Sequence, residues 1–143
     1  MSVCFPDAAR AIMTERFGHD NLIALATVDN GLPCVRTVNA YYEDGCFYVV
    51  TYLLSGKMQQ ILRNPAIAVS GDWFTGRGVG ENLGHILLPE NAALAAKIRT
   101  AFAAWYNNGH TNEADPNTII LRLRLQTGVL MNSGVRYDIT FPA

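Results

Sequence analysis

Polar and cationic side chains recur where two predicted strands meet the helix that follows them. Arg36 lies in one segment of strand character, Thr51 ends the next, and Ser55-Gly56-Lys57 opens the helix. Adjacent antiparallel strands run in opposite directions, so Arg36 and Thr51 can come within side-chain reach. A helix N-terminus adds free N–H groups and a positive dipole end. With two cations beside it, this pattern predicts a site for a phosphate or similar anion; the alternative is a serine cap next to two solvated cations.

The two common nucleotide-binding loops do not fit the sequence. A Walker A motif that ends at Gly56-Lys57 requires glycine at position 51, where Thr51 stands. A dinucleotide-binding fingerprint that begins Gly76-x-Gly78 requires its third glycine at position 81, which is Glu81. The anion site therefore needs a different architecture.

Aromatic and histidine side chains offer few further possibilities. Trp73 and Trp105 could stack on a flat heterocycle, but core or dimer-interface positions are the alternative for each. The three histidines have no metal-ligand spacing to one another or to cysteine, so we expect no metal site: His19, His85 and His110. Serine nucleophile elbows and paired acids are also absent from the sequence. An anion site without an acid–base pair favours a protein whose bound cofactor carries the chemistry.

Short strands joined by tight turns must position these residues. Asn30-Gly31 and Glu43-Asp44-Gly45 are turn signals, and Asn64-Pro65 ends a helix. The segment 75–84 holds four glycines and is either a loop or a strand closely approached by another backbone. Hydrophobic periodicity predicts helices over 7–17, 56–63 and 89–106, and strands over 22–28, 33–39, 46–51, 66–74, 118–125, 128–132 and 137–141. This order predicts a mainly β protein, a small closed antiparallel barrel with helical additions, as a single domain over residues 1–143.

Composition limits the classes of partner. Half of the 143 residues are hydrophobic and 16% are charged, which suits a folded domain with some surface covered by a partner chain. The net charge is −1 and no run of cations is present, so we expect no nucleic-acid binding. No apolar run reaches the roughly 18 residues of a membrane span, and no signal peptide is recognised. Three cysteines without paired spacing fit a reducing cytoplasm.

A set of ordered segments resembles one family. The set is Leu25-Ala26-Thr27-Val28, Gly31-Leu32-Pro33, Arg36-Thr37-Val38, Phe47-Tyr48-Val49-Val50-Thr51, Ser55-Gly56-Lys57 and Asn64-Pro65. In this order it resembles the pyridoxamine-5′-phosphate-oxidase-like family, the FMN-binding split barrel. The resemblance implies a homodimer that binds flavin mononucleotide (FMN) at its interface.

The resemblance also assigns expected roles to residues. Arg36, Ser55, Gly56 and Lys57 match positions that bind the phosphate of FMN. Strand positions that line the ribityl chain and the isoalloxazine ring are matched by Thr37, Val38, Asn39 and Thr51. Trp73 is similar to an aromatic residue that the family places close to the flavin.

Departures from the family pattern shape the functional expectation. The chain ends Tyr137-Asp138-Ile139-Thr140-Phe141-Pro142-Ala143. It lacks the arginine-rich segment that binds the phosphate of the substrate in pyridoxamine-phosphate oxidases. It looks more like small bacterial members related to general stress proteins and nitroimidazole-resistance reductases. We therefore expect an FMN-dependent oxidoreductase of unknown small substrate. The alternatives are a non-enzymatic flavin-binding or redox-sensing dimer, a haem protein using His85 or His110, and a deazaflavin-binding member of the same fold.

Overall fold

Tight turns with left-handed backbone positions join the first three strands. In the computed structural model, which describes residues 3–143, these strands are β1 (Asn21–Asp29), β2 (Leu32–Glu43) and β3 (Cys46–Tyr52). Asn30 and Gly31 have φ angles of 50° and 81°, and Asp44 and Gly45 have φ angles of 47° and 84°. Two-residue hairpins need such positive φ angles, which glycine, asparagine and aspartate adopt at least cost. Both predicted turns are confirmed.

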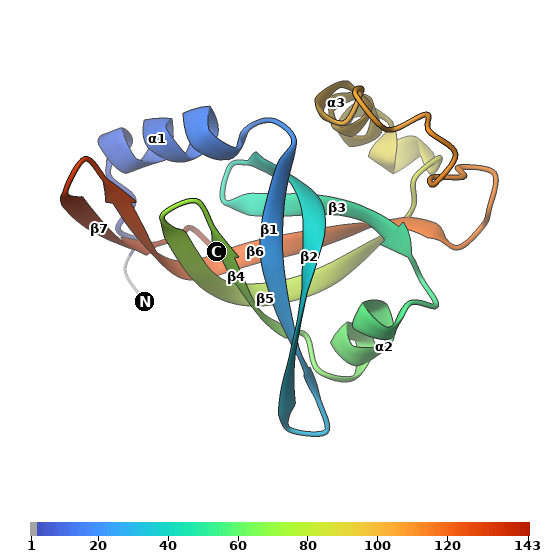
Figure 1. Ribbon diagram of the computed structural model, residues 1–143, viewed down its shortest axis with the longest axis horizontal. Coiled ribbons are helices and arrows are strands. Elements are labelled where there is room, and N and C mark those ends of the chain that lie inside the picture. Colours follow the sequence, from blue (N-terminus) through green and yellow to red (C-terminus); the bar gives the residue numbers. More distant parts are fainter. Residues whose placement is uncertain (1–2) are drawn as a thin grey trace.

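Six of the seven strands close into an antiparallel barrel. The order around the ring is β1-β2-β3-β6-β5-β4, with closure by the pairing of β3 with β6. The later strands of the ring are β4 (Ala66–Gly71), β5 (Phe74–His85) and β6 (Thr118–Asn132), and the seventh strand, β7 (Val135–Thr140), pairs with the second half of β6. The predicted split-barrel fold class, mainly β with flanking helices, is confirmed (Figure 1).

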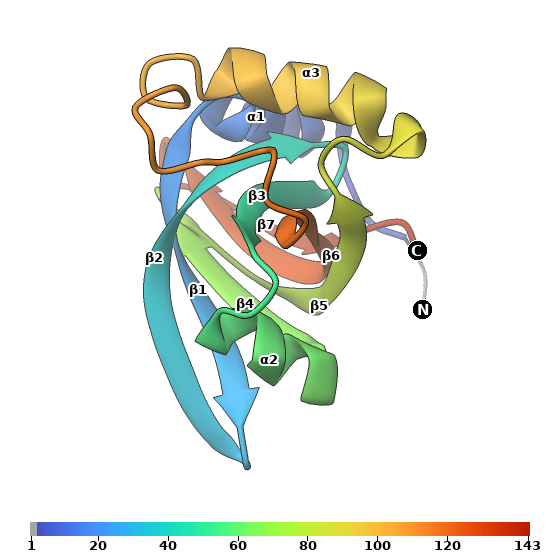
Figure 2. The ribbon, with the colours of Figure 1, turned by 90° about the vertical axis from the view of Figure 1, so that its right-hand side faces the viewer.

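Three α-helices cover different parts of the barrel (Figures 1 and 2). The first, α1 (Asp7–Phe17), buries Phe17 against Phe47 and Phe74 at one end, with ring centroids 5.5 and 5.9 Å away. The second, α2 (Gly56–Arg63), lies at the opposite end and buries Met58 and Ile61. The short η1 (Pro89–Asn91) leads into α3 (Ala92–Ala101), which lies on the outside of the barrel. Within residues 3–143, no helix is long and apolar enough to cross a membrane.

The barrel interior and the underside of α3 form two separate apolar clusters. Inward-facing residues alternate along each strand of the ring, as Ile23 and Leu25 do on β1. The second cluster joins α3 to the outer face of β6, with Ile98 and Phe102 fully buried beside Ile120. A strand that is buried on both faces loses the alternating pattern, and residues 118–121 of β6 are all buried for this reason.

The predicted boundaries differ from the structure between residues 66 and 85. A single strand over 66–74 was expected, but β4 ends at Gly71 and the chain turns at Asp72 and Trp73. Trp73 has a φ of 51°, an angle that bulky residues rarely adopt. Because a turn was not expected at such a residue, the predicted strand continued through Trp73. The glycine-rich segment is not a loop. It forms β5, the second of the two predicted possibilities.

Two further boundaries also differ. Helix α3 ends at Ala101 rather than near residue 106, and hydrogen-bonded turns follow it. The predicted strands 118–125 and 128–132 are one continuous strand, β6, whose pairing with β5 is irregular at a bulge between Arg77 and Gly78. The predicted gap at residues 126–127 is therefore part of the strand, and Gly128 within it is required by packing, because a Cβ there would lie 2.7 Å from Phe74.

Candidate anion and cofactor site

Strands β2 and β3 separate shortly after the turn that joins them. Their pairing covers only Glu43 with Cys46, Tyr42 with Phe47, and Tyr41 with Tyr48. Beyond this, residues 32–40 of β2 pair with β1 alone, and residues 49–52 of β3 pair with β6 alone. An antiparallel strand directs backbone N–H and C=O groups toward both edges. The facing edges of β2 and β3 therefore present groups that no described strand satisfies, and we call this opening the split.

Arg36 lies on β2 at the α2 end of the split, held by three acceptors. Its Nη1 donates to the Leu25 carbonyl oxygen at 3.2 Å and to Thr27 Oγ1 at 2.7 Å. Its Nη2 donates to Gln60 Oε1 at 3.0 Å, and Thr27 Oγ1 also donates to Gln60 Oε1 at 2.6 Å. A guanidinium has five N–H donors. Two donors therefore remain for a ligand while three fix the orientation of the group.

Lys57 brings a second cation to the same place. Its Nζ donates to Thr51 Oγ1 at 2.8 Å and approaches Ser55 Oγ at 3.5 Å. The pKa of Lys57 is lowered from its ordinary value, first because burial disfavours the ammonium and then because the positive charge of Arg36 repels it. Hydrogen bonds thus join Lys57 to Thr51 and Ser55, and Arg36 lies near enough for its charge to act on Lys57.

The N-terminus of α2 completes this group of donors. Ser55 is the N-cap, and its Oγ accepts from the Met58 N–H at 3.4 Å. The N–H groups of Gly56 and Lys57, at the first two helix positions, have no acceptor in the described part of the chain. A Cβ added to Gly56 would meet no atom within 4 Å, so the space in front of the helix is open.

Neither cation of this group is neutralised by a carboxylate that the structure describes, although most other cations of the protein are. Six ion pairs join arginine or lysine to carboxylates elsewhere, whereas within residues 3–143 neither Arg36 nor Lys57 has a carboxylate within 4.0 Å. Two partly buried, uncompensated cations are unfavourable on their own, and an anion relieves that cost. We name Arg36, Thr51, Ser55, Gly56 and Lys57 the cation cluster. Its donors fit a phosphate group well.

The remaining residues predicted for the cofactor site lie in different places. On β2, Val38 points into the barrel core and is 8% exposed, whereas Thr37 is exposed on the other face. Asn39 is partly buried, and its amide donates to Asp20 Oδ1 at 3.0 Å. Trp73 is 72% exposed on the β4–β5 turn near α1, at the opposite end of the barrel from the cation cluster (Figure 1). Trp73 therefore does not join the cluster within one chain.

Two residues that support Arg36 were not predicted. Thr27 is 1% exposed and Gln60 lies on α2, three residues after Lys57. Thr27 occupies an inward position after Ile23 and Leu25, and a lone polar residue in such an apolar run needs a partner. That signal was available in the sequence. For Gln60 the only signal was its spacing along the helix, which does not specify the partner.

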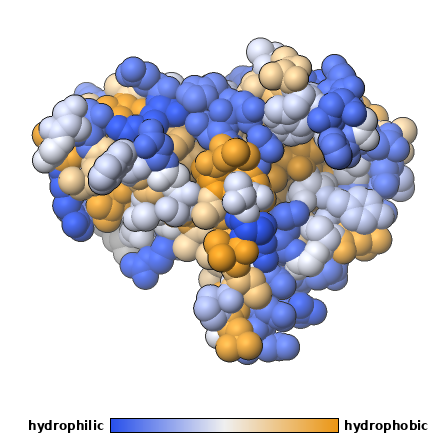
Figure 3. Space-filling model, viewed as in Figure 1, coloured by the Kyte–Doolittle hydropathy of each residue, from blue (hydrophilic) through white to orange (hydrophobic). Residues whose placement is uncertain are grey.

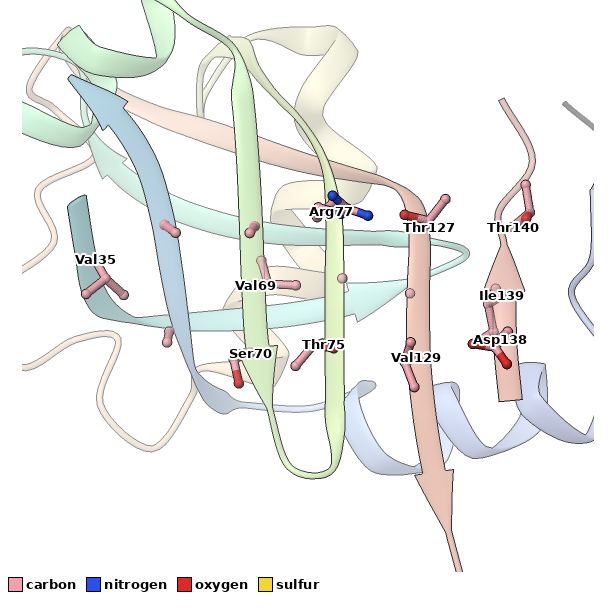
Figure 4. A pocket seen from close by; sticks show the side chains of 15 residues that line it. Val35, Val69, Ser70, Thr75, Arg77, Thr127, Val129, Asp138, Ile139 and Thr140 are labelled. Carbon is pink, nitrogen blue, oxygen red and sulfur yellow. The ribbon is translucent and has the colours of Figure 1, made fainter. Parts of the chain in front are cut away.

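A separate pocket of about 690 Å³ lies on the outer face of the sheet (Figure 4). Its walls come from β1, β2 and β4–β7, and many of the lining residues are small: Ala24, Ala26, Ala68, Gly76 and Gly128. Val35 lines the pocket from β2, and Arg77 and Asp138 are its charged residues. None of the nine residues predicted for the cofactor site lines this pocket.

The histidines do not form a metal site in the described chain. His85 Nε2 lies 3.0 Å from the Asp115 carbonyl oxygen, and His85 Nδ1 accepts from the Leu87 N–H at 3.2 Å. Both ring nitrogens of His85 are therefore used by the backbone. His110 is exposed in the segment after α3, and within residues 3–143 no group of three histidine, cysteine or acidic residues could hold a metal ion.

Solved structures share this fold at low sequence identity. General stress protein 26 from Bacillus anthracis has a TM-score of 0.65 at 20% identity, with 91% of this chain and 92% of that chain covered. An FAD-binding protein from Mesorhizobium loti has a TM-score of 0.59 at 16% identity, with 90% and 96% covered. A heme-binding protein from Mycobacterium smegmatis has a TM-score of 0.67 at 21% identity, with 96% of this chain but 60% of that chain covered.

Sequence comparison identifies the family. Among curated proteins, none is similar enough to match the chain. The family profile described as pyridoxamine 5′-phosphate oxidase matches residues 5–132, which include every strand of the barrel and the cation cluster. The chain therefore belongs to the pyridoxamine 5′-phosphate oxidase family.

Proposed function

We propose that this protein binds FMN in the split between β2 and β3 and acts as an FMN-dependent oxidoreductase on a small substrate. The observation that carries the proposal is the cation cluster, where two partly buried cations without carboxylate partners meet a helix N-terminus. A terminal phosphate monoester is the ligand that these donors suit best. Membership of the family and the FAD-binding relative support a flavin as the rest of the ligand.

Each part of the cluster has a distinct task in this proposal. Arg36, fixed by Thr27 and Gln60, donates two N–H groups to the phosphate, and Lys57 adds a point charge. The unpaired edges of β2 and β3 offer backbone groups to the polar parts of the ribityl chain and the ring, near Thr37, Val38 and Asn39. When bound, the flavin supplies two-electron redox chemistry, and the protein supplies binding and orientation.

The assignment of Arg36 to the phosphate is tested by a variant that should lose affinity for FMN but not for riboflavin. Arg36→Ala should weaken FMN binding by about 2–5 kcal/mol, the cost of removing one partner of a charged hydrogen-bonded pair. Riboflavin lacks the phosphate, so its weaker binding should change little. Fluorescence titration with both ligands measures the difference.

A control on α2, the helix that carries Lys57, makes this test specific. Arg63 is exposed and pairs with Asp29 at 3.5 Å, so Arg63→Ala removes a nearby arginine without touching the cluster. We expect this variant to bind both ligands like the wild type. If Arg36→Ala weakens riboflavin as much as FMN, Arg36 does not bind the phosphate and the proposed site is wrong.

The other cofactors are separated by simple measurements. The heme-binding relative makes haem the second candidate, but the engaged ring nitrogens of His85 leave that histidine without a free ligand position. The absorption spectrum of the purified protein distinguishes flavin from haem, and the mass of the released cofactor distinguishes FMN from a deazaflavin. Turnover with NADH or NADPH and a panel of acceptors separates an oxidoreductase from a flavin-binding redox sensor.

We also propose that the protein functions as a cytoplasmic homodimer that shares the flavin sites between its chains. The outer face of β1 and β2 supports this proposal. Leu22 and Val35 on this face are 68% and 70% exposed, which is costly for a monomer in water. Figure 3 shows apolar surface along β1 and the β1–β2 hairpin, next to the pocket lined by Val35. An identical face on a second copy is the partner that two-fold symmetry offers.

A further inference from the structure

One carboxylate connects two elements that are distant in the sequence. Asp20 lies in the loop between α1 and β1, and its two oxygens accept hydrogen bonds from different directions. Oδ1 accepts from Asn39 Nδ2 on β2 at 3.0 Å, and Oδ2 accepts from Trp105 Nε1 beyond α3 at 2.8 Å. Asp20 is in no ion pair of the described chain. Its carboxylate therefore serves to hold the indole ring beside β2.

One face of this indole ring packs on the second apolar cluster. The ring stacks on fully buried Phe102 with centroids 4.8 Å apart and an interplanar angle of 28°. Tyr48 and Val50 of β3 pack against the same cluster. Trp105 is thus attached to the β3 side by packing and to the β2 side by Asp20, and it remains partly exposed.

These attachments locate Trp105 at the point where the split begins. The last pair between β2 and β3 is Tyr41 with Tyr48, so Asn39 and Val50 are two residues beyond it on each strand. Asn39 is three residues from Arg36 along β2, about 10 Å at the rise of an extended strand. A ribityl chain can bridge such a span when the phosphate occupies the cation cluster.

We propose that Asp20 is a positioning residue, and that it orients Trp105 as an aromatic wall for the isoalloxazine ring. This wall lies at the end of the split next to the Tyr41–Tyr48 pair, opposite the α2 end. The proposal rests on the proposed function, because the ring of the bound flavin is what Trp105 contacts. Stacked aromatic rings are favourable beyond their buried area, and the fixed hydrogen bond removes the freedom of the indole to rotate away.

The test compares two variants that alter the same hydrogen bond from opposite sides. Asp20→Asn keeps the shape of the side chain but replaces one acceptor oxygen with an NH2 group, so the residue can no longer accept from both Asn39 and Trp105. Trp105→Phe keeps an aromatic ring but removes the N–H donor. Each should weaken FMN about three- to tenfold, the range expected for one aromatic contact. Each should also raise the emission of bound FMN, because an indole in contact with a flavin quenches it. The double variant should lose little more than either single variant.

Two controls separate positioning from a purely structural role. Lys97 of α3 pairs with Glu43 of β2 at 2.6 Å, so Lys97→Ala loosens another link between these elements without touching Trp105. This variant should leave FMN affinity and emission unchanged. Inorganic phosphate, which occupies the cation cluster without a ring, should raise the melting temperature equally in wild type, Asp20→Asn and Trp105→Phe. If Asp20 and Trp105 had a merely structural role, both variants would bind phosphate as well as FMN more weakly than the wild type.

The outcomes distinguish this inference from the proposed function. If FMN is retained by the wild type and lost with Arg36→Ala, but its emission and affinity are unchanged in Asp20→Asn and Trp105→Phe, the positioning role is refuted and the FMN site stands. If the wild type retains no FMN under ultrafiltration, the proposed function and the positioning role both fail.

Discussion

Single residues decide the chemistry of the cation cluster, and Lys57 is the most informative of them. Its lowered pKa means that the folded protein holds this proton less tightly than the unfolded chain does. Below the folded pKa, the ammonium therefore opposes folding, and this penalty disappears as pH rises from the folded pKa to the ordinary 10.5. A phosphate next to Lys57 reverses the effect by favouring the ammonium.

A pH-dependent affinity follows from this residue. FMN should bind the wild type progressively more weakly as pH rises above the lowered pKa of Lys57, because the free protein then loses the proton that phosphate requires. In Lys57→Met this decline should be absent, since Arg36 stays charged and Thr51 and Ser55 do not titrate there. Titrations of both proteins across this alkaline range measure the difference, and any ionisation of the flavin ring is common to both.

The same substitution makes a claim about stability without ligand. Methionine keeps the aliphatic stem while it removes a desolvated charge repelled by Arg36, so the melting temperature of the apo protein should not fall. An equal decline of FMN affinity with pH in wild type and Lys57→Met would remove Lys57 from the site.

Strand β5 shows how an element depends on close contact with its neighbour. A Cβ on Gly78 would lie 2.0 Å from the Arg124 carbonyl oxygen, at the bulge between Arg77 and Gly78. Backbone cannot move aside as a flexible side chain can. This contact explains why a segment rich in glycine forms a strand of twelve residues instead of a loop.

Gly78→Ala should therefore be far more harmful than its small size suggests. We expect a loss of roughly 2 kcal/mol or more in the free energy of unfolding, because β5 and β6 must separate locally to admit the methyl group. The neighbouring Arg77→Ala, on the exposed side of the same strand, should stay within about 0.5 kcal/mol of wild type. Chemical denaturation of both variants provides the comparison, and similar losses would contradict the close-contact explanation.

The sequence predicted those parts of the fold that depend on local signals. The two positive-φ turns, the Ser55 cap and the helix ended by Asn64-Pro65 have local causes, and all appear at the expected positions. The glycines of β5 and the fusion of two strands into β6 depend on contacts with distant backbone, which no local pattern specifies. The tie from Asp20 to Trp105 spans 85 positions, so the sequence offered no sign of it.

The residues of the cation cluster could be predicted because they lie close together in the chain, whereas the position of Trp73 relative to them could not. Lys57 follows Thr51 by six positions and donates a hydrogen bond to it, and Arg36 lies on the strand that one tight hairpin joins to the strand of Thr51. Trp73 was grouped with these residues by resemblance alone, and the barrel separates it from them within one chain. Whether Trp73 reaches a flavin depends on a second chain.

At the scale of the whole molecule, the exposed face of β1 and β2 is the feature that a single chain leaves unsatisfied. An obligate interface buries more than about 2,000 Å² in total, or about 1,000 Å² from each chain. That is roughly one eighth of the 7605 Å² surface of one chain. The apolar strip of Leu22 and Val35, with the adjoining pocket of small residues, provides a continuous surface on which such an area can form.

We therefore expect light scattering at micromolar concentration to give about twice the 15.7 kDa mass of the chain. Val35→Asp places a charge at the centre of the proposed interface, where two-fold symmetry brings it near its own copy, so this variant should dissociate at concentrations where the wild type remains dimeric. Leu87→Asp is the matched control, because Leu87 is 54% exposed in the turn before η1 and outside the strip.

If the dimer shares its flavin sites, Val35→Asp should also lose FMN affinity upon dilution, in parallel with its dissociation. A wild-type protein that scatters as a monomer would refute the dimer, and a monomeric Val35→Asp variant with undiminished FMN affinity would show that each chain binds flavin alone.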